Sequence, residues 1–317
     1  MQEFFQLLIS AGESGTKLSF HILLPVMVIM MALMRVLDNK GVLRRIAIWL
    51  TPVFGLFGLP GLGVFAILQI HFVSFAAPVS TFKIMDQDEI INDRRIAASF
   101  AGILTMSQAN AAFPLAAVGL NLWVTMLTSL LGGLLAGWVT YKFFTRKFNK
   151  EESNIINEVD DLKSEIQPAK KEGIIKSVLA GAEEGLQLVL KSIPLLVIAI
   201  FLVNVLKSLK VIEFLGKTLA PVLTQVGLPG AAILPIVTKY IAGGTAMMGV
   251  SMKLVTEGSM TALQLNKIAG LLTNPLDPVG VAILAAAGPR IAKVTIPAIK
   301  GALIGILFRG IAHFIIF

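Results

Sequence analysis

Polar or conformationally special residues interrupt two apolar segments in each half of the sequence, and chemistry is expected at these four interruptions. They are residues 74–78 (SFAAP), 105–110 (TMSQAN), 243–245 (GGT) and 273–278 (TNPLDP). A helix broken inside a membrane exposes backbone N–H groups at the start of one half-helix and carbonyls at the end of the other. The first can hold an anion and the second a cation. The alternative is a loop between two shorter spans, in which residues 273–278 only turn the chain.

Matching interruptions in two halves of a membrane chain are typical of a transporter with a binding site near the middle of the bilayer. Residues 74–78 and 243–245 occupy equivalent positions in the two halves, but their residue types differ. We predict a substrate site built from the polar and small residues of all four interruptions. These are Ser74, Ser107, Gln108, Asn110, Gly243, Gly244, Thr245, Asn274 and Asp277.

Two titratable residues are candidates for coupling to a proton or an ion. Asp277 is the only acidic residue in the apolar run 268–287. A charged side chain at bilayer depth costs about 2.5–3.5 kcal/mol on insertion scales, so Asp277 is expected to line a cavity or to pair with a cation. Its alternative role is an interfacial turn, in which the carboxylate caps its own backbone. His71 lies in the middle of an apolar segment, where it either serves a proton or substrate or makes a helix–helix hydrogen bond.

The sequence lacks the signatures of enzymes and metal centres. It has no cysteine and only three histidines, which argues against a catalytic transition-metal site. It also has no H-E-x-x-H, P-loop, G-x-S-x-G or G-x-G-x-x-G pattern in a suitable context. We therefore expect no enzymatic activity, no cofactor and no bound metal; a lipid-modifying enzyme is not favoured for the same reason.

Composition identifies the elements that must position these residues as membrane-spanning helices. Hydrophobic residues make up 56% of the 317, charged residues 15%, and the mean hydropathy is +0.82. Soluble chains are about a quarter charged, and the bilayer favours helices of about 20 apolar residues. We predict a multi-pass protein of the bacterial cytoplasmic (inner) membrane. The basic residues behind the net charge of +8 are scattered at segment ends, which suits anionic lipid and not nucleic acid. The expected partners are the bilayer and a small solute or ion, and a homo-oligomer is left open.

An internal repeat divides the chain into two units. Residues 50–61 (LTPVFGLFGLPG) and 219–230 (LAPVLTQVGLPG) share seven of twelve positions at an offset of 169. This predicts two tandem membrane units, 1–145 and 173–317, joined by the polar linker 146–172. Each unit begins with an amphipathic stretch, 1–16 or 173–186. Five apolar segments follow in each, at 17–37, 43–57, 61–82, 96–118 and 120–144, and again near 187–206, 211–226, 230–250, 267–287 and 294–317.

Topology follows from the number of crossings. Five crossings per unit are an odd number, so the second unit is inverted relative to the first. The basic residues at 35–45, 83–95 and 142–150 then face one side, which the positive-inside rule makes cytoplasmic. Residues 132, 133 and 137 are glycines in the fifth segment and predict close helix contact there.

The motifs of the second unit resemble a known family of membrane domains. They are Ala180-Gly181 with Gly185, the proline-centred Ile193-Pro194-Leu195, the P-V-x-x-x-x-G-L-P-G turn and the two interruptions. The unit is similar to the nucleoside-recognition, or Gate, domain family, which includes spore maturation proteins A and B, the membrane part of ferrous-iron transporters and parts of concentrative nucleoside transporters. The first unit departs from the pattern, with Ser-Phe-Ala at 74–76 where the second has Gly-Gly-Thr. The resemblance implies two inverted repeats with re-entrant or broken helices at their interface.

These observations favour an all-α polytopic membrane protein that works as a secondary transporter of a small polar solute or ion. Alternating access would rock one repeat against the other around the predicted site. The alternative is a non-transporting scaffold or morphogenetic factor, in which the interruptions serve packing and the linker 146–172 binds a partner.

Overall fold

The computed structural model describes residues 2–148, 173–211, 214, 218, 223, 225 and 227–317. These residues contain helices and no strand, so the predicted all-α architecture is confirmed. Five of the described helical stretches are long and apolar enough to cross a membrane. They are Phe4–Asn39, Leu122–Phe144, Ile174–Leu206, Gly230–Thr256 and Thr295–Ile316. The predicted linker falls almost entirely outside the described residues, so the domain division stays a prediction.

Each unit begins with one long helix. In the first unit α1 (Gln2–Leu18), the π-helical segment η1 (Ser19–Leu23) and α2 (Leu24–Asn39) are continuous, and in the second unit α10 runs over Ile174–Ser208. The prediction of separate amphipathic elements at 1–16 and 173–186 was therefore wrong. The physical reason is that neither junction carries a residue that breaks the backbone ladder; Leu18 and Leu23 both keep right-handed helical dihedral angles.

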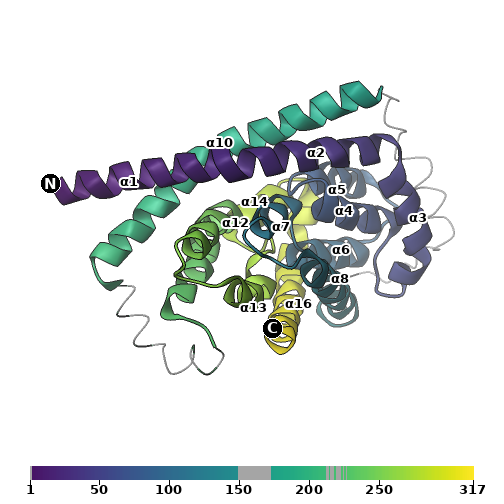
Figure 1. Cartoon of the computed structure of the whole chain (residues 1–317). Coiled ribbons are helices and arrows are strands. Elements are labelled where there is room, and N and C mark those ends of the chain that lie inside the picture. Colours follow the sequence, from purple (N-terminus) through teal and green to yellow (C-terminus); the bar gives the residue numbers. More distant parts are fainter. Residues whose placement is uncertain are drawn as a thin grey trace.

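The two long helices pack along each other on one side of the molecule (Figure 1). Small residues let them approach closely. A Cβ atom placed on Gly181 would lie 2.5 Å from the carbonyl oxygen of Met31, and one on Gly185 would lie 2.8 Å from that of Met27. In the view of Figure 1 the shorter helices lie below this pair.

The third apolar segment turns back on itself. After α3 (Val42–Gly55), α4 (Gly61–Phe72) and α5 (Ala77–Gln87) form a hairpin whose arms pack together. Thr81 Oγ1 donates across it to Gln69 Oε1 at 2.7 Å. The single span predicted at 61–82 is thus corrected to a re-entrant hairpin, because the backbone leaves the helix at Val73 (φ −102°, ψ −80°) and α5 restarts at the proline of its first turn.

The fourth segment is a broken helix, as predicted. It consists of α6 (Asp93–Thr105) and α7 (Ala109–Ala116), with extended backbone at Met106 and Gln108 between them. The fifth is α8 (Leu122–Val139), which continues into the π-helical η2 (Thr140–Phe144).

The second unit repeats this plan where it is described. Its helices are η3 (Gly230–Ala232), α12 (Ile233–Thr256), α13 (Ala262–Leu272), α14 (Pro278–Ala285), α15 (Pro289–Lys293) and α16 (Thr295–Ile316). Gly243 interrupts α12 with φ 85° and ψ 178°, and residues 273–277 separate α13 from α14. The tetrapeptides 58–61 and 227–230 both lie between helices, as expected, and Gly58 and Gly227 both have positive φ. Most of the predicted segment 211–226 lies outside the described residues.

Helix α16 packs against α6, α8 and α13 and so joins the two units. The predicted close contacts of α8 are present. A Cβ atom on Gly133 would lie 3.2 Å from the carbonyl oxygen of Gly102, and one on Gly305 would lie 2.4 Å from that of Gly132. These contacts bring the interruptions of both units into one region of the molecule.

Candidate functional site

The two broken helices are joined to each other at their interruptions. The backbone N–H of Gln108 donates to the carbonyl of Thr273 at 3.0 Å. The side-chain amide of Gln108 donates to the carbonyl of Asn274, also at 3.0 Å. Ser107 Oγ and Thr273 Oγ1 lie 2.8 Å apart. Backbone groups that each helix leaves unpaired where it breaks are thus satisfied by the other break, as buried polar groups require.

The interruption of α12 lies against the same region. A Cβ atom on Gly244 would come within 2.6 Å of Gln108 Nε2, and one on Gly243 would lie 3.4 Å from Asp277 Oδ1. Gly243 also has a positive φ, which favours glycine. At Gly244 the backbone of α12 therefore lies closer to Gln108 than a larger residue would allow, whereas at Gly243 it is the positive φ that favours glycine.

These elements line a small cavity of about 60 Å³. All four interruptions contribute residues to its wall. The lining residues are Phe75, Gln108, Asn110, Ala242, Gly243, Gly244, Thr245, Asp277, Val279 and Gly280. Six of the nine predicted site residues are among them.

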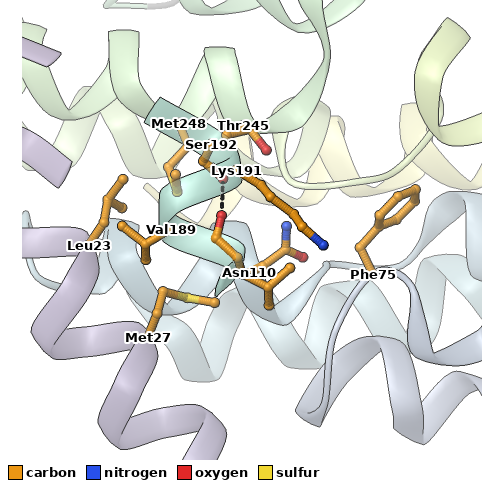
Figure 2. A pocket seen from close by; sticks show the side chains of 10 residues that line it. Leu23, Met27, Phe75, Asn110, Val189, Lys191, Ser192, Thr245 and Met248 are labelled. Carbon is orange, nitrogen blue, oxygen red and sulfur yellow. Dashed lines mark hydrogen bonds between the residues drawn. The ribbon is translucent and has the colours of Figure 1, made fainter. Parts of the chain in front are cut away.

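A larger cavity of about 170 Å³ shares three lining residues, Phe75, Asn110 and Thr245, with the small one (Figure 2). Its other walls come from the long helices and from α12: Leu23, Met27, Leu188, Val189, Lys191, Ser192 and Met248. Figure 2 shows the Lys191 side chain extending across this space toward Phe75. The cavity thus has an apolar wall on one side and several hydrogen-bonding groups on the other.

Asn110 supplies an unused acceptor at the junction of the two cavities. Its Oδ1 is buried and has no hydrogen-bond partner among the described residues. A buried carbonyl oxygen without a partner is costly. A bound molecule with an N–H or O–H group would satisfy it.

Asp277 combines the two roles considered for it. Its Oδ1 accepts from the backbone N–H of Gly280 at 2.8 Å and caps α14, which is the turn role. Its Oδ2 forms an ion pair with Lys239 Nζ, and both side chains are buried. The expected cation partner of Asp277 is therefore a side chain of the protein, from a position 38 residues away in the sequence.

Three of the nine predicted site residues, Ser74, Ser107 and Asn274, line neither cavity, and the coupling candidate His71 does not line one either. Ser74 is buried in the hairpin turn, beside Phe75, which does line both. Asn274 holds its own turn, because its Oδ1 accepts from the N–H of Leu276 at 3.1 Å.

Ser107 and His71 belong to a buried hydrogen-bond network at helix contacts. The backbone N–H of Ser107 donates to Ser129 Oγ at 2.6 Å. His71 Nε2 lies 2.8 Å from the same Ser129 hydroxyl, and its Nδ1 lies 2.9 Å from the carbonyl of Ile67. For His71 this is the helix–helix hydrogen bond that the sequence offered as the alternative role.

Sequence reasoning missed Lys239 as the partner of Asp277, and it missed Arg309 entirely. Arg309 is fully buried in α16 and donates to Ser107 and Thr273, one from each broken helix. A signal was present, since an arginine inside an apolar span is costly and marks a functional or structural site. Among the described residues, no group of metal-ligating side chains has the arrangement of a metal site.

Comparison with solved structures identifies proteins that share this fold. No protein-family model and no curated protein sequence matches the chain. Solved structures of CNTnw, a concentrative nucleoside transporter, match nearly its whole length. One variant in an outward-facing state is 18% identical, with a TM-score of 0.68 over 93% of this chain and 74% of that one. CNTnw in an inward-facing substrate-bound state is 17% identical, with a TM-score of 0.66 over 93% of this chain and 73% of that one.

A third structure, a CNTnw variant in an intermediate state, is 17% identical, with a TM-score of 0.68 over 93% of this chain and 75% of that one. The chain therefore has the fold of a membrane transporter of the concentrative nucleoside type, one of the groups to which the repeat motifs pointed. The narrower resemblance to spore maturation proteins stays a prediction.

Proposed function

We propose that this protein is a secondary transporter that moves a small polar solute across a membrane, and that the solute binds in the two adjoining cavities. One observation carries the proposal: helix interruptions from both sequence units line the same cavity. Interrupted helices are the usual construction of a transport site near the bilayer midplane. The fold shared with a nucleoside transporter supports the same conclusion.

The position of the larger cavity suggests how access would alternate. Leu23, Met27 and Val189 come from the two long helices, whereas Asn110 and Thr245 come from the interrupted ones. The cavity thus lies between two groups of helices. A displacement of one group along the other would open the cavity to one side of the membrane and close it from the other.

The lining groups limit the chemistry of the solute. The unpaired Oδ1 of Asn110 calls for a hydrogen-bond donor. Lys191 and Thr245 can donate to an acceptor, while Met27 and Met248 offer apolar contact. Cavities of about 170 and 60 Å³ are small compared with the roughly 300–1,000 Å³ of drug-sized pockets. We expect a compact solute with donor and acceptor groups on one side and an apolar surface on the other.

Neither the inverted relation of the two units nor the bacterial inner membrane follows from the geometry, and both remain parts of this proposal. The re-entrant hairpin changes the count of crossings in the first unit. At about 1.5 Å per residue the 14 residues of α3 span about 21 Å, less than the roughly 30 Å hydrocarbon core. The first unit then crosses three times, through α1–α2, α6–α7 and α8, which is again an odd number.

The proposal is tested by ligand screening of the purified full chain in lipid nanodiscs. A solute that binds the folded state raises the melting temperature by mass action. We expect a hit among nucleosides, amines and small organic acids, followed by uptake of that solute into proteoliposomes. Asn110→Ala should weaken the hit at least about tenfold, since 1.4 kcal/mol corresponds to a factor of ten.

The matched control is Lys300→Ala, which removes an exposed side chain on α16 that lines neither cavity. It should leave ligand binding unchanged. A chain that binds none of these solutes and supports no uptake would be a scaffold, and the transport proposal would be wrong.

A further inference from the structure

Arg309 is a buried cation without a carboxylate partner. Its side chain is 0% exposed in the middle of α16, and no acidic residue among those described forms an ion pair with it. It is packed against α8 so tightly that a Cβ atom on Gly132 would lie 2.5 Å from Arg309 Cγ. A charge in this position must be stabilised by something other than a counter-ion.

The acceptors of Arg309 are oxygens at the ends of two half-helices. Nη1 donates to the carbonyl of Thr105, the last residue of α6. Nη2 donates to Thr273 Oγ1 at 2.8 Å, and Thr273 directly follows the last residue of α13. Nη2 also donates to Ser107 Oγ at 2.7 Å, whereas Nε has no partner. The carboxyl end of a helix carries partial negative charge on its unpaired carbonyls. The terminal carbonyl of α6 and the hydroxyl that follows the end of α13 therefore converge on one guanidinium.

The two helix ends are equivalent in the repeat. The stretch AGILT at 101–105 matches AGLLT at 269–273, which pairs Thr105 with Thr273. In transporters with interrupted helices, carbonyls at half-helix carboxyl ends coordinate the coupling Na⁺ or proton. A carbonyl and two hydroxyls are also the hard oxygen donors that such a cation prefers.

Taking the proposed function as its premise, we propose that Arg309 is a tethered cation occupying the place of a coupling ion between the carboxyl ends of α6 and α13. Wild-type protein would then bind no Na⁺ or K⁺ there. The ion pair of Lys239 with Asp277 is a second example of a side-chain cation in such a place. From the sequence, Asp277 was a candidate to bind a free proton or ion, and in the structure it binds the lysine ammonium group instead. Arg309 is in this sense a residue that determines ion dependence, and it does not touch the solute cavities.

The experiment compares wild type, Arg309→Ala and Arg309→Met. Thermal unfolding is measured in nanodiscs at constant ionic strength, with NaCl or KCl replacing N-methyl-D-glucamine chloride, and separately with millimolar methylguanidinium. Wild type should show no saturable response. Arg309→Ala opens a space lined by three oxygens, so it should be less stable and should gain a saturable rise with Na⁺, K⁺ or methylguanidinium. That rise would be about 3 °C at ten times the dissociation constant. Arg309→Met removes the charge but keeps the space filled, so it should lose stability without gaining a cation response.

Two controls keep the outcome decisive. Lys300→Ala removes an exposed charge from the same helix and should behave as wild type. Adding Thr273→Val to Arg309→Ala removes one ligand and should abolish the acquired response.

A folded Arg309→Ala chain with no response to any of these cations would overturn the proposal. If Arg309→Ala does not fold, equilibrium binding of radioactive Na⁺ to wild type decides the question. Retention of one Na⁺ that Thr273→Val abolishes would refute the tethered cation, and absence of such binding would support it. None of these measurements needs the solute. A positive result in a chain that transports nothing would therefore reject the proposed function and keep this role for Arg309.

Discussion

Asp277→Asn is the most informative substitution at the candidate site, because it separates the two contacts of one side chain. Asparagine can still accept the hydrogen bond from Gly280 that caps α14. It cannot neutralise Lys239, whose side chain is 0% exposed. The substitution therefore removes only the ion pair and leaves a buried ammonium group without a partner. From sequence alone the variant would be expected to fold normally, but the buried Lys239 changes that expectation.

The expected loss of stability in Asp277→Asn follows from the burial of the Lys239 charge. Breaking a buried ion pair by removing one partner costs about 3–5 kcal/mol, most of it the penalty of the charge left behind. For a chain of this size that corresponds to a fall in melting temperature on the order of 10 °C. Replacing both partners, as in Asp277→Asn with Lys239→Met, removes both buried charges. The double variant should recover to within about 1 kcal/mol of wild type or become more stable.

The assay is thermal unfolding of the four chains of this double-mutant cycle in nanodiscs, with membrane abundance recorded for each. The control is Lys293→Ala, which breaks the pair with Asp93 where the lysine side chain is 61% exposed. It should cost less than about 1 kcal/mol. Wild-type stability of Asp277→Asn alone, or a double variant no better than the single ones, would refute the reasoning that a buried pair holds α12 against α14.

Three further predictions follow from other contacts. Gly181→Ala should lower stability by about 1–3 kcal/mol, because its Cβ would meet the backbone of α2, whereas the repeat-equivalent Gly12→Ala has open space around it and should be neutral or stabilising by thermal unfolding. Ser129→Ala should cost about 1–3 kcal/mol in the same assay by leaving two buried groups without their shared hydroxyl, and an effect no larger than that of a substitution at an exposed serine would contradict the network. A topology reporter fused after Phe317 should behave as periplasmic if the two units are inverted, and a cytoplasmic result would favour parallel units.

The sequence by itself determined the features that depend on local chemistry. Composition required a helical membrane protein, because a bilayer leaves backbone groups no other partner. Two of the interruptions could be located because glycine tolerates a positive φ and closely spaced prolines remove backbone donors, as at Gly243 and residues 273–277. The sequence also predicted the close approach of α8 to its neighbours, because Gly132 and Gly133 have no side chain that would keep the helices apart.

Local chemistry was less informative about where a helix continues and about which way the chain runs after a break. Residues 1–16 are amphipathic, yet nothing in them stops the helix, so the chain continues unbroken to Asn39. The segment 61–82 has an interruption in the expected place, but a break specifies only that the ladder ends. Whether the chain then crosses or turns back was decided by packing of α5 on α4 and by the Thr81–Gln69 contact.

Only the tertiary structure decided which residues meet at the site. Phe75 faces the cavities and its neighbour Ser74 does not, a difference of one position in a turn without regular periodicity. Lys239 reaches Asp277 across 38 positions, and Arg309 reaches Thr105 across 204. Contacts over such separations depend on how whole helices pack. The cost of burying a charge tells a reader of the sequence that a partner must exist, and only the packed helices determine which residue it is.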